Sequence, residues 1–139
     1  MSTLIRPELT VKNRYWIERH RYYELKHFCL QYPIWKKAYE ALDSLSQRPD
    51  DLSIFSKTNA VNDPVSKCAE ARLAYSAKML LVEQAAKDTD IELCGYILTA
   101  VTEGLSYNQL KAQFDIPCCK DVYYVLYRKF FWVLNKTRL

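Results

Sequence analysis

Hydrophobic and polar residues recur with the period of an α-helix over most of this chain. In residues 11–31 and again in 34–45, apolar side chains return at intervals of three to four positions, which is the spacing of one helical face. Tyr32-Pro33 separates the two segments, since the residue before a proline disfavours helical dihedrals. We therefore expect two helices that form a hairpin, preceded by an arm over residues 1–10.

The same period continues in the second half of the chain. Asp63-Pro64 suits the start of a third helix, because Asp favours the N-cap and Pro the first helical position. An apolar stripe then extends to about Asp88, and residues 91–103 predict a fourth helix. Gly104 follows directly, and glycine commonly ends a helix in a left-handed conformation.

Two further helices with a tight turn between them are predicted near the end of the chain. Ser106 and Gln109 have the spacing of a capping box, in which each side chain hydrogen-bonds the other residue's backbone N–H. Asp115, Ile116 and Pro117 form the turn, and we expect Pro117 to open the last helix. The apolar stripe expected on that helix consists of Val122, Leu126, Phe130 and Val133.

Composition agrees with a helical protein that has one core. The chain has 139 residues, half of them hydrophobic, and only 2 glycines, which disfavours a turn-rich β fold. We predict an all-α, single-domain protein of about six helices. Its parts are a basic, aromatic hairpin over 1–45, a linker over 46–62, and a helical core over 63–139 that contains the helix-turn-helix at 104–134.

The distribution of charge and the cysteine content indicate which kind of partner and which cellular compartment to expect. The net charge is +4, and an excess of basic residues lies at both ends of the chain, where residues 105–139 carry 6 basic against 2 acidic side chains. Such clustering is typical of a nucleic-acid-binding surface, although a solvated basic face gives the same pattern. The 5 cysteines show no pairing pattern, which favours reduced thiols in a cytoplasmic protein. Neither a signal peptide nor a membrane span is expected.

The segment from Gly104 to Leu134 resembles the helix-turn-helix in region 4 of bacterial sigma factors. The resemblance rests on Gly104-Leu105-Ser106 at its start and Ile116-Pro117 at its turn, and it covers roughly the last 35 residues. Small phage transcription regulators of the ArpU and RinA type carry a similar C-terminal module. In this chain Asp115 stands where a glycine is usual. The Cys118-Cys119 pair adds one residue before the last helix.

The resemblance implies that the last helix enters the major groove of duplex DNA. The side chains expected to contact DNA lie away from the apolar stripe, mainly in the first half of that helix: Lys120, Asp121, Tyr124, Tyr127, Arg128 and Lys129. Arginine can bind guanine edges with two hydrogen bonds, whereas lysine and tyrosine more often bind phosphate. The tyrosines have a second interpretation, which is packing against the first helix of the motif.

Other candidate sites have weaker support. The first helix interleaves aromatic and basic residues, a pattern that fits base stacking, a protein contact or a plain amphipathic helix with a basic outer face. His20 and His27 lack a third ligand at fitting spacing, so we expect no metal site and no cofactor. The sequence contains no nucleophile-base pattern and no phosphate-binding loop, so we expect no enzyme.

We therefore predict a sequence-specific DNA-binding transcription regulator of phage or mobile-element type. Its partner would be double-stranded DNA, with RNA polymerase and a second copy of the chain as further candidates. The alternative is a helical module that binds a protein, either as an RNA polymerase adaptor or as an inhibitor of a host protein. A small packaging protein that binds phage DNA is a third interpretation.

Overall fold

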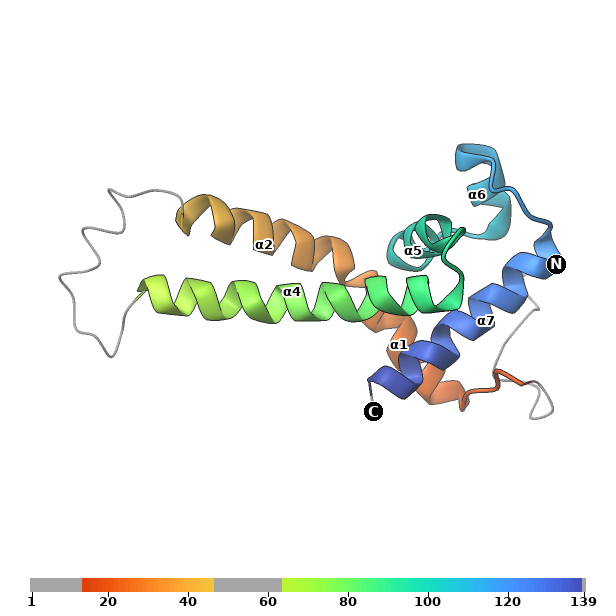
Figure 1. Ribbon diagram of the computed structural model, residues 1–139, viewed down its shortest axis with the longest axis horizontal. Helices are drawn as coiled ribbons and strands as arrows, with labels where there is room; N and C mark the ends of the chain where they lie inside the picture. Colours follow the sequence, from red (N-terminus) through yellow and green to blue (C-terminus); the bar gives the residue numbers. More distant parts are fainter. Residues whose placement is uncertain (1–13, 47–63, 139) are drawn as a thin grey trace. The chain divides into compact units, whose positions relative to one another are not determined.

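The computed structural model describes residues 14–46 and 64–138, and these residues are almost entirely α-helical (Figure 1). No strand occurs in the described part of the chain, so the predicted all-α class is confirmed. The helices, in chain order, are α1 (Arg19–Leu30), α2 (Tyr32–Ser46), α4 (Pro64–Thr89), α5 (Cys94–Glu103), α6 (Tyr107–Phe114) and α7 (Lys120–Thr137).

The chain divides into two compact units. Unit 1 comprises residues up to Gln31 together with those from Leu81 onward, and unit 2 runs from Tyr32 to Leu80. The division falls between α1 and α2 and again within α4. The segment 1–45, predicted as one hairpin, is therefore shared between the two units.

Unit 2 contains α2 and the first part of α4. Trp35 of α2 is buried, and the Lys78 ammonium lies 5.8 Å from the centre of its ring. The Arg72 guanidinium stacks over Tyr39 at 5.5 Å and forms a 3.0 Å ion pair with Asp43. These contacts join the two helices along their length, so the helix that pairs with α2 inside this unit is α4.

Unit 1 holds the larger core, in which α1 packs against α5 and α7. Leu25 and Cys29 of α1, Ile97 of α5, and Phe131 and Leu134 of α7 are almost fully buried. Burial raises the pKa of the Cys29 thiol to about 12, because an apolar environment disfavours the thiolate. The core thus depends on residues from both ends of the chain.

Local capping explains why the predicted starts of the first and the fourth helix were wrong. The first helix begins at Arg19 and not near residue 11, because the Glu18 carboxylate accepts hydrogen bonds from the backbone N–H groups of His20 and Arg21. The helix predicted from residue 91 begins at Cys94, because the Asp90 side chain accepts from the N–H groups of the residues two and three positions on and holds 91–93 in a turn.

Other predicted boundaries are confirmed. Pro64 is the first residue of α4, which continues to Thr89, while the N-cap predicted at Asp63 and the arm over 1–10 lie outside the described residues. Gly104 ends α5 with φ of 71°, in the left-handed region. Most of the predicted linker, residues 47–62, is likewise outside the described part of the chain.

Candidate nucleic-acid interface

A small core holds α5, α6 and α7 together. Ala100 of α5, Leu110 of α6, Ile116 of the following turn and Tyr123 of α7 are all buried and pack in one cluster. Each helix, and the turn itself, thus contributes a side chain to the same centre. Because the turn residue is as fully buried as those of the helices, the angle between α6 and α7 is fixed by packing.

The start of α6 is formed as predicted. The Ser106 hydroxyl accepts from the Gln109 N–H at 3.3 Å, and the Gln109 side chain accepts from the Ser106 N–H at 2.8 Å. This reciprocal pair is a complete capping box, and it satisfies two backbone donors that a helix start otherwise leaves open. Leu110 of α6 is buried, whereas Phe114 at the end of this helix is 46% exposed.

Hydrogen bonds across the turn fix its geometry. The Tyr107 hydroxyl donates to the backbone oxygen of Cys118 at 2.6 Å, and the Lys111 ammonium donates to the oxygen of Ile116 at 3.2 Å. Asp115 adopts φ of 51°, a left-handed conformation that favours glycine. Asp115 thus adopts a backbone conformation that few residues other than glycine favour.

Pro117 was predicted to open the last helix, but it lies in the turn before that helix. Helix α7 begins at Lys120, with Cys119 as N-cap in an extended conformation. Two contacts explain the difference, because Ile116 is anchored in the core and Cys118 is held by Tyr107. These anchors keep residues 116–119 out of a helix.

The inward face of α7 also differs from the predicted stripe. Tyr123, Phe130, Phe131 and Leu134 are buried, whereas Val122 is 47% exposed. Of the four predicted stripe residues, only Phe130 is fully buried. The predicted stripe begins at Val122, whereas the buried face begins at Tyr123. Because neighbouring residues differ by about 100° around a helix, this shift of one residue turns a different face inward.

The outward face of α7 brings several predicted DNA contacts together. Asp121, Val125, Arg128 and Lys129 are spaced by three or four residues and so share one side of the helix, with Val122 beside them. Asp121 is exposed, and Val122 and Val125 are each about half exposed. Arg128 and Lys129 are partly exposed, and the Arg128 guanidinium donates to the Tyr124 backbone oxygen at 3.2 Å. We call these five residues the α7 outer face.

Three predicted contact residues lie elsewhere. Lys120 is the first residue of α7 and is partly exposed, near the turn. The Tyr124 ring packs against Tyr123 with ring centres 4.9 Å apart. Tyr127 faces inward, where its hydroxyl shares a 2.5 Å hydrogen bond with that of Tyr22 and burial raises its pKa well above the usual value. The contact of Tyr127 with DNA stays a prediction, and its hydroxyl already has a partner inside unit 1.

The sequence interpretation missed Val122 and Val125 as surface residues. Val122 was assigned to the core because hydrophobic side chains are usually placed inward, and Val125 was assigned to neither face. The tyrosines of this helix could have indicated it. If Tyr123 and Tyr127 are assigned to the core, both valines face outward. A tyrosine buries a large apolar ring and needs only one polar partner, so it is a suitable core residue.

The basic, aromatic surface of α1 serves mainly structural contacts. Arg21 donates to the Asn135 side chain at 2.6 Å and to the Arg138 backbone oxygen at 2.9 Å, and it also pairs with Glu24. Tyr22 is buried against Phe131, with ring centres 5.2 Å apart. These residues attach α1 to the C-terminal half of α7, so they are not available as a stacking platform for bases.

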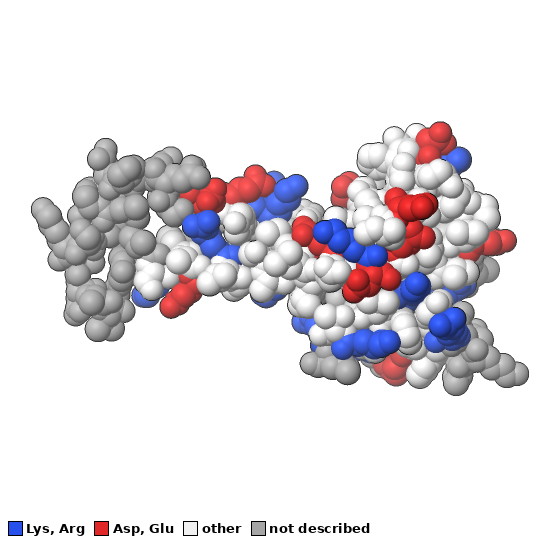
Figure 2. Space-filling view, viewed as in Figure 1, with Lys and Arg blue, Asp and Glu red and all other residues white. Residues whose placement is uncertain are grey.

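Charges on unit 1 are mixed. Figure 2 shows basic and acidic side chains interspersed over the face of unit 1 turned to the viewer. Among the described residues, no group of three or more His, Cys, Asp or Glu is placed to bind a metal ion. Within the same residues, no helix combines the length and the hydropathy that a bilayer crossing requires.

Comparison with known proteins found no match to a family model, to a curated protein or to a solved structure.

Proposed function

We propose that unit 1 binds double-stranded DNA as a helix-turn-helix protein, with the α7 outer face in the major groove. The observation that carries this proposal is the shared core of α5, α6, the turn and α7, which fixes α7 while its opposite face remains accessible. A recognition helix needs both properties, because its side chains must meet base edges in a fixed register.

The chemistry of the α7 outer face suits base recognition. The Asp121 carboxylate can accept a hydrogen bond from the amino group of cytosine, and the exposed valines can contact the methyl group of thymine. Arg128 and Lys129, farther along the helix, suit guanine or phosphate oxygens. An acidic side chain next to two apolar ones would bind poorly to a featureless phosphate backbone, so this arrangement favours sequence-specific binding.

The test is fluorescence anisotropy of the full chain on a pool of random duplexes at two salt concentrations. The affinity should fall as salt rises, because bound lysine and arginine displace counterions from phosphates. The variant Arg128→Ala/Lys129→Ala should bind more weakly, with a salt slope shallower by about one for each lost phosphate contact. The matched control is Lys36→Ala/Lys37→Ala, which removes the same charge from exposed positions of α2 in unit 2.

Comparison of the two double variants shows whether DNA binding depends on the net charge of the chain or on the position of the basic residues in α7. Equal losses in both double variants would mean that net charge alone attracts DNA and would contradict the role of α7. If the wild type fails to bind at low salt while circular dichroism shows it folded, the DNA proposal fails. Selection of sequences from the pool then tests base contacts, since Asp121→Ala should change the preferred sequence more than the overall affinity.

The exposed apolar residues favour a second candidate function, the binding of a protein partner such as RNA polymerase. Val122 and Val125, and Phe114 at the end of α6, are each close to half exposed. Exposed apolar groups are common at the centre of protein interfaces. Binding through them would be nearly insensitive to salt, whereas binding to DNA would not. Action in a bacterial cell at a phage promoter stays a prediction from the resemblance.

A further inference from the structure

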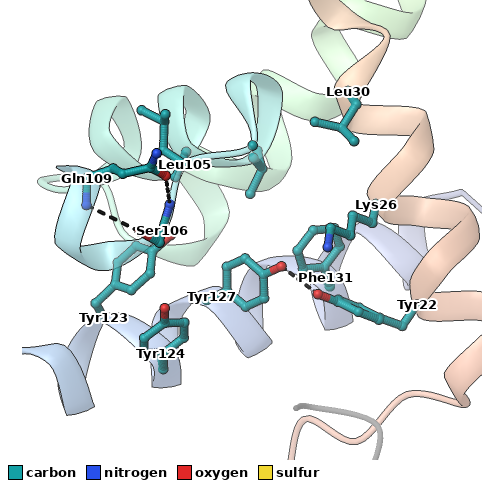
Figure 3. Close-up of a pocket in the computed structure, with 13 residues that line it drawn as sticks. Tyr22, Lys26, Leu30, Leu105, Ser106, Gln109, Tyr123, Tyr124, Tyr127 and Phe131 are labelled. Carbon is teal, nitrogen blue, oxygen red and sulfur yellow. Dashed lines mark hydrogen bonds between the residues drawn. The ribbon is translucent and has the colours of Figure 1, made fainter. Parts of the chain in front are cut away.

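Unit 1 contains a cavity of about 300 Å³ behind α7, on the side away from the α7 outer face (Figure 3). Three elements form its walls: α1, the connection from α5 to α6, and α7. The side chains that matter for the argument are Tyr22 and Lys26 from α1, and Tyr123, Tyr124, Tyr127 and Phe131 from α7. At the small end of the usual range for ligand sites, this volume suits a compact molecule.

The cavity has one charged wall residue, Lys26. No aspartate or glutamate lines it, and Lys26 forms no ion pair with any residue that the structure describes. In Figure 3 its side chain extends from α1 toward the side of the cavity where Tyr22 and Tyr127 meet. A lone ammonium beside a partly enclosed, apolar-walled space favours a single negative charge on the occupant.

The phenol groups add polar contacts at fixed places. The hydroxyls of Tyr22 and Tyr127 are joined by a 2.5 Å hydrogen bond, which fixes both rings in the wall. The hydroxyl of Tyr123, which is 1% exposed, has no hydrogen-bond partner among the described residues. A buried hydroxyl without a partner is unfavourable, so this group favours an occupant that has a polar atom able to hydrogen-bond it.

The rings define the shape of the occupant. Phe131 and the tyrosines present ring edges and faces, and rings attract one another best in edge-to-face or offset contacts. The start of α6 borders the cavity at Ser106 and Gln109, but their capping box already satisfies the two backbone donors there. At the two residues of this helix start that border the cavity, a phosphate would therefore find no free backbone donor, and one lysine alone suits a carboxylate better.

We propose that this cavity binds a small aromatic carboxylate, with the carboxylate at Lys26 and the ring among the tyrosines. The proposal does not rest on DNA binding, because its residues line the inner side of α7 and its test contains no DNA. The probes are benzoate, 4-hydroxybenzoate and phenylacetate, and benzyl alcohol is the uncharged control. Isothermal titration of the full chain should give saturable binding of at least one acid and weaker binding of the alcohol.

Variants assign the binding to the cavity. Lys26→Met keeps most of the side-chain volume and should weaken binding of the acid by roughly tenfold or more, the scale of a charge-assisted hydrogen bond. Lys26→Arg should restore most of the affinity. Lys36→Met removes an exposed lysine from unit 2 and should leave binding unchanged. In ¹H–¹⁵N spectra, the shifts induced by the acid should center on Lys26 and on Gly104 and Leu105, which border the cavity.

Three results would overturn the proposal. The first is no saturable binding of any of the three acids by the folded wild type at millimolar concentration. The second is equal binding of the acid by the wild type and Lys26→Met. The third is a set of shifted amides that lies away from the cavity.

Discussion

The turn between α6 and α7 offers the sharpest test of the fold, through the substitution Ile116→Ala. Ile116 is fully buried with Ala100, Leu110 and Tyr123, although it lies in an irregular segment beside the exposed Pro117. If this side chain fixes α7 against α5 and α6, its truncation must destabilise all of unit 1. A turn that merely connects two helices would tolerate the change.

The magnitude follows from the buried volume. Replacing isoleucine by alanine removes three carbon atoms, and at about 0.8 kcal/mol for each buried carbon the lost transfer free energy is about 2.4 kcal/mol. A cavity that the surroundings fill only in part adds to this, and buried isoleucine-to-alanine changes cost about 2–5 kcal/mol in total. We expect the free energy of unfolding of unit 1 to fall by about 3 kcal/mol.

The control is the same substitution at an exposed site of the same unit. Ile91 is 71% exposed in the turn before α5, so Ile91→Ala should change the stability by less than about 0.5 kcal/mol. Native-state hydrogen exchange of the amides in α5, α6 and α7 reports on unit 1 separately from unit 2, and urea denaturation followed by circular dichroism provides the second measurement. Equal stability of the two variants would refute the packing described for the turn.

Three further predictions concern caps, backbone strain and pH. Ser106→Ala should lower stability by about 1 kcal/mol in urea denaturation, because the Gln109 N–H loses its acceptor, while Ser106→Thr should cost only a few tenths. Asp115→Gly should be more stable than Asp115→Ala by about 1 kcal/mol in the same assay, because φ of 51° disfavours a side chain and the exposed ion pair to Lys111 contributes little. The pKa of the Cys29 thiol rises from 9.0 in the unfolded chain to about 12 in the fold, so its contribution to stability is complete below pH 9 and is lost as the pH rises toward 12. Denaturation midpoints measured across that range should fall less steeply for Cys29→Ala than for the wild type.

Local signals in the sequence predicted the helix ends well where one side chain determines the backbone. The capping box at Ser106 and Gln109, the left-handed Gly104 and the start of α4 at Pro64 all depend on residues within four positions of the helix end. The wrongly predicted starts at residues 11 and 91 have the same origin, because the acidic side chains of Glu18 and Asp90 move the observed starts to Arg19 and Cys94. Such errors are correctable from sequence.

The pairing of helices was not predictable in the same way. Whether α1 packs against α2 or against α7 depends on side chains more than 100 positions apart, such as Arg21 with Asn135 and Tyr22 with Tyr127. Amphipathic periodicity identifies the face of a helix that becomes buried, but any apolar face can pack against any other. The partition of the chain into units 1 and 2 therefore needed the three-dimensional structure.

The orientation of α7 had the largest consequence for function, and it was determined by the tyrosines. Hydrophobic spacing alone permits either Val122 or Tyr123 as the first inward residue, since neighbouring positions differ by about 100°. Burying Tyr123 moves Tyr127 inward as well, where its hydroxyl meets Tyr22, and turns both valines toward solvent. The same rotation places the tyrosines around the cavity beside Lys26. The α7 outer face and the cavity thus lie on opposite sides of one helix, so a molecule bound in the cavity would contact the same helix that is proposed to contact DNA.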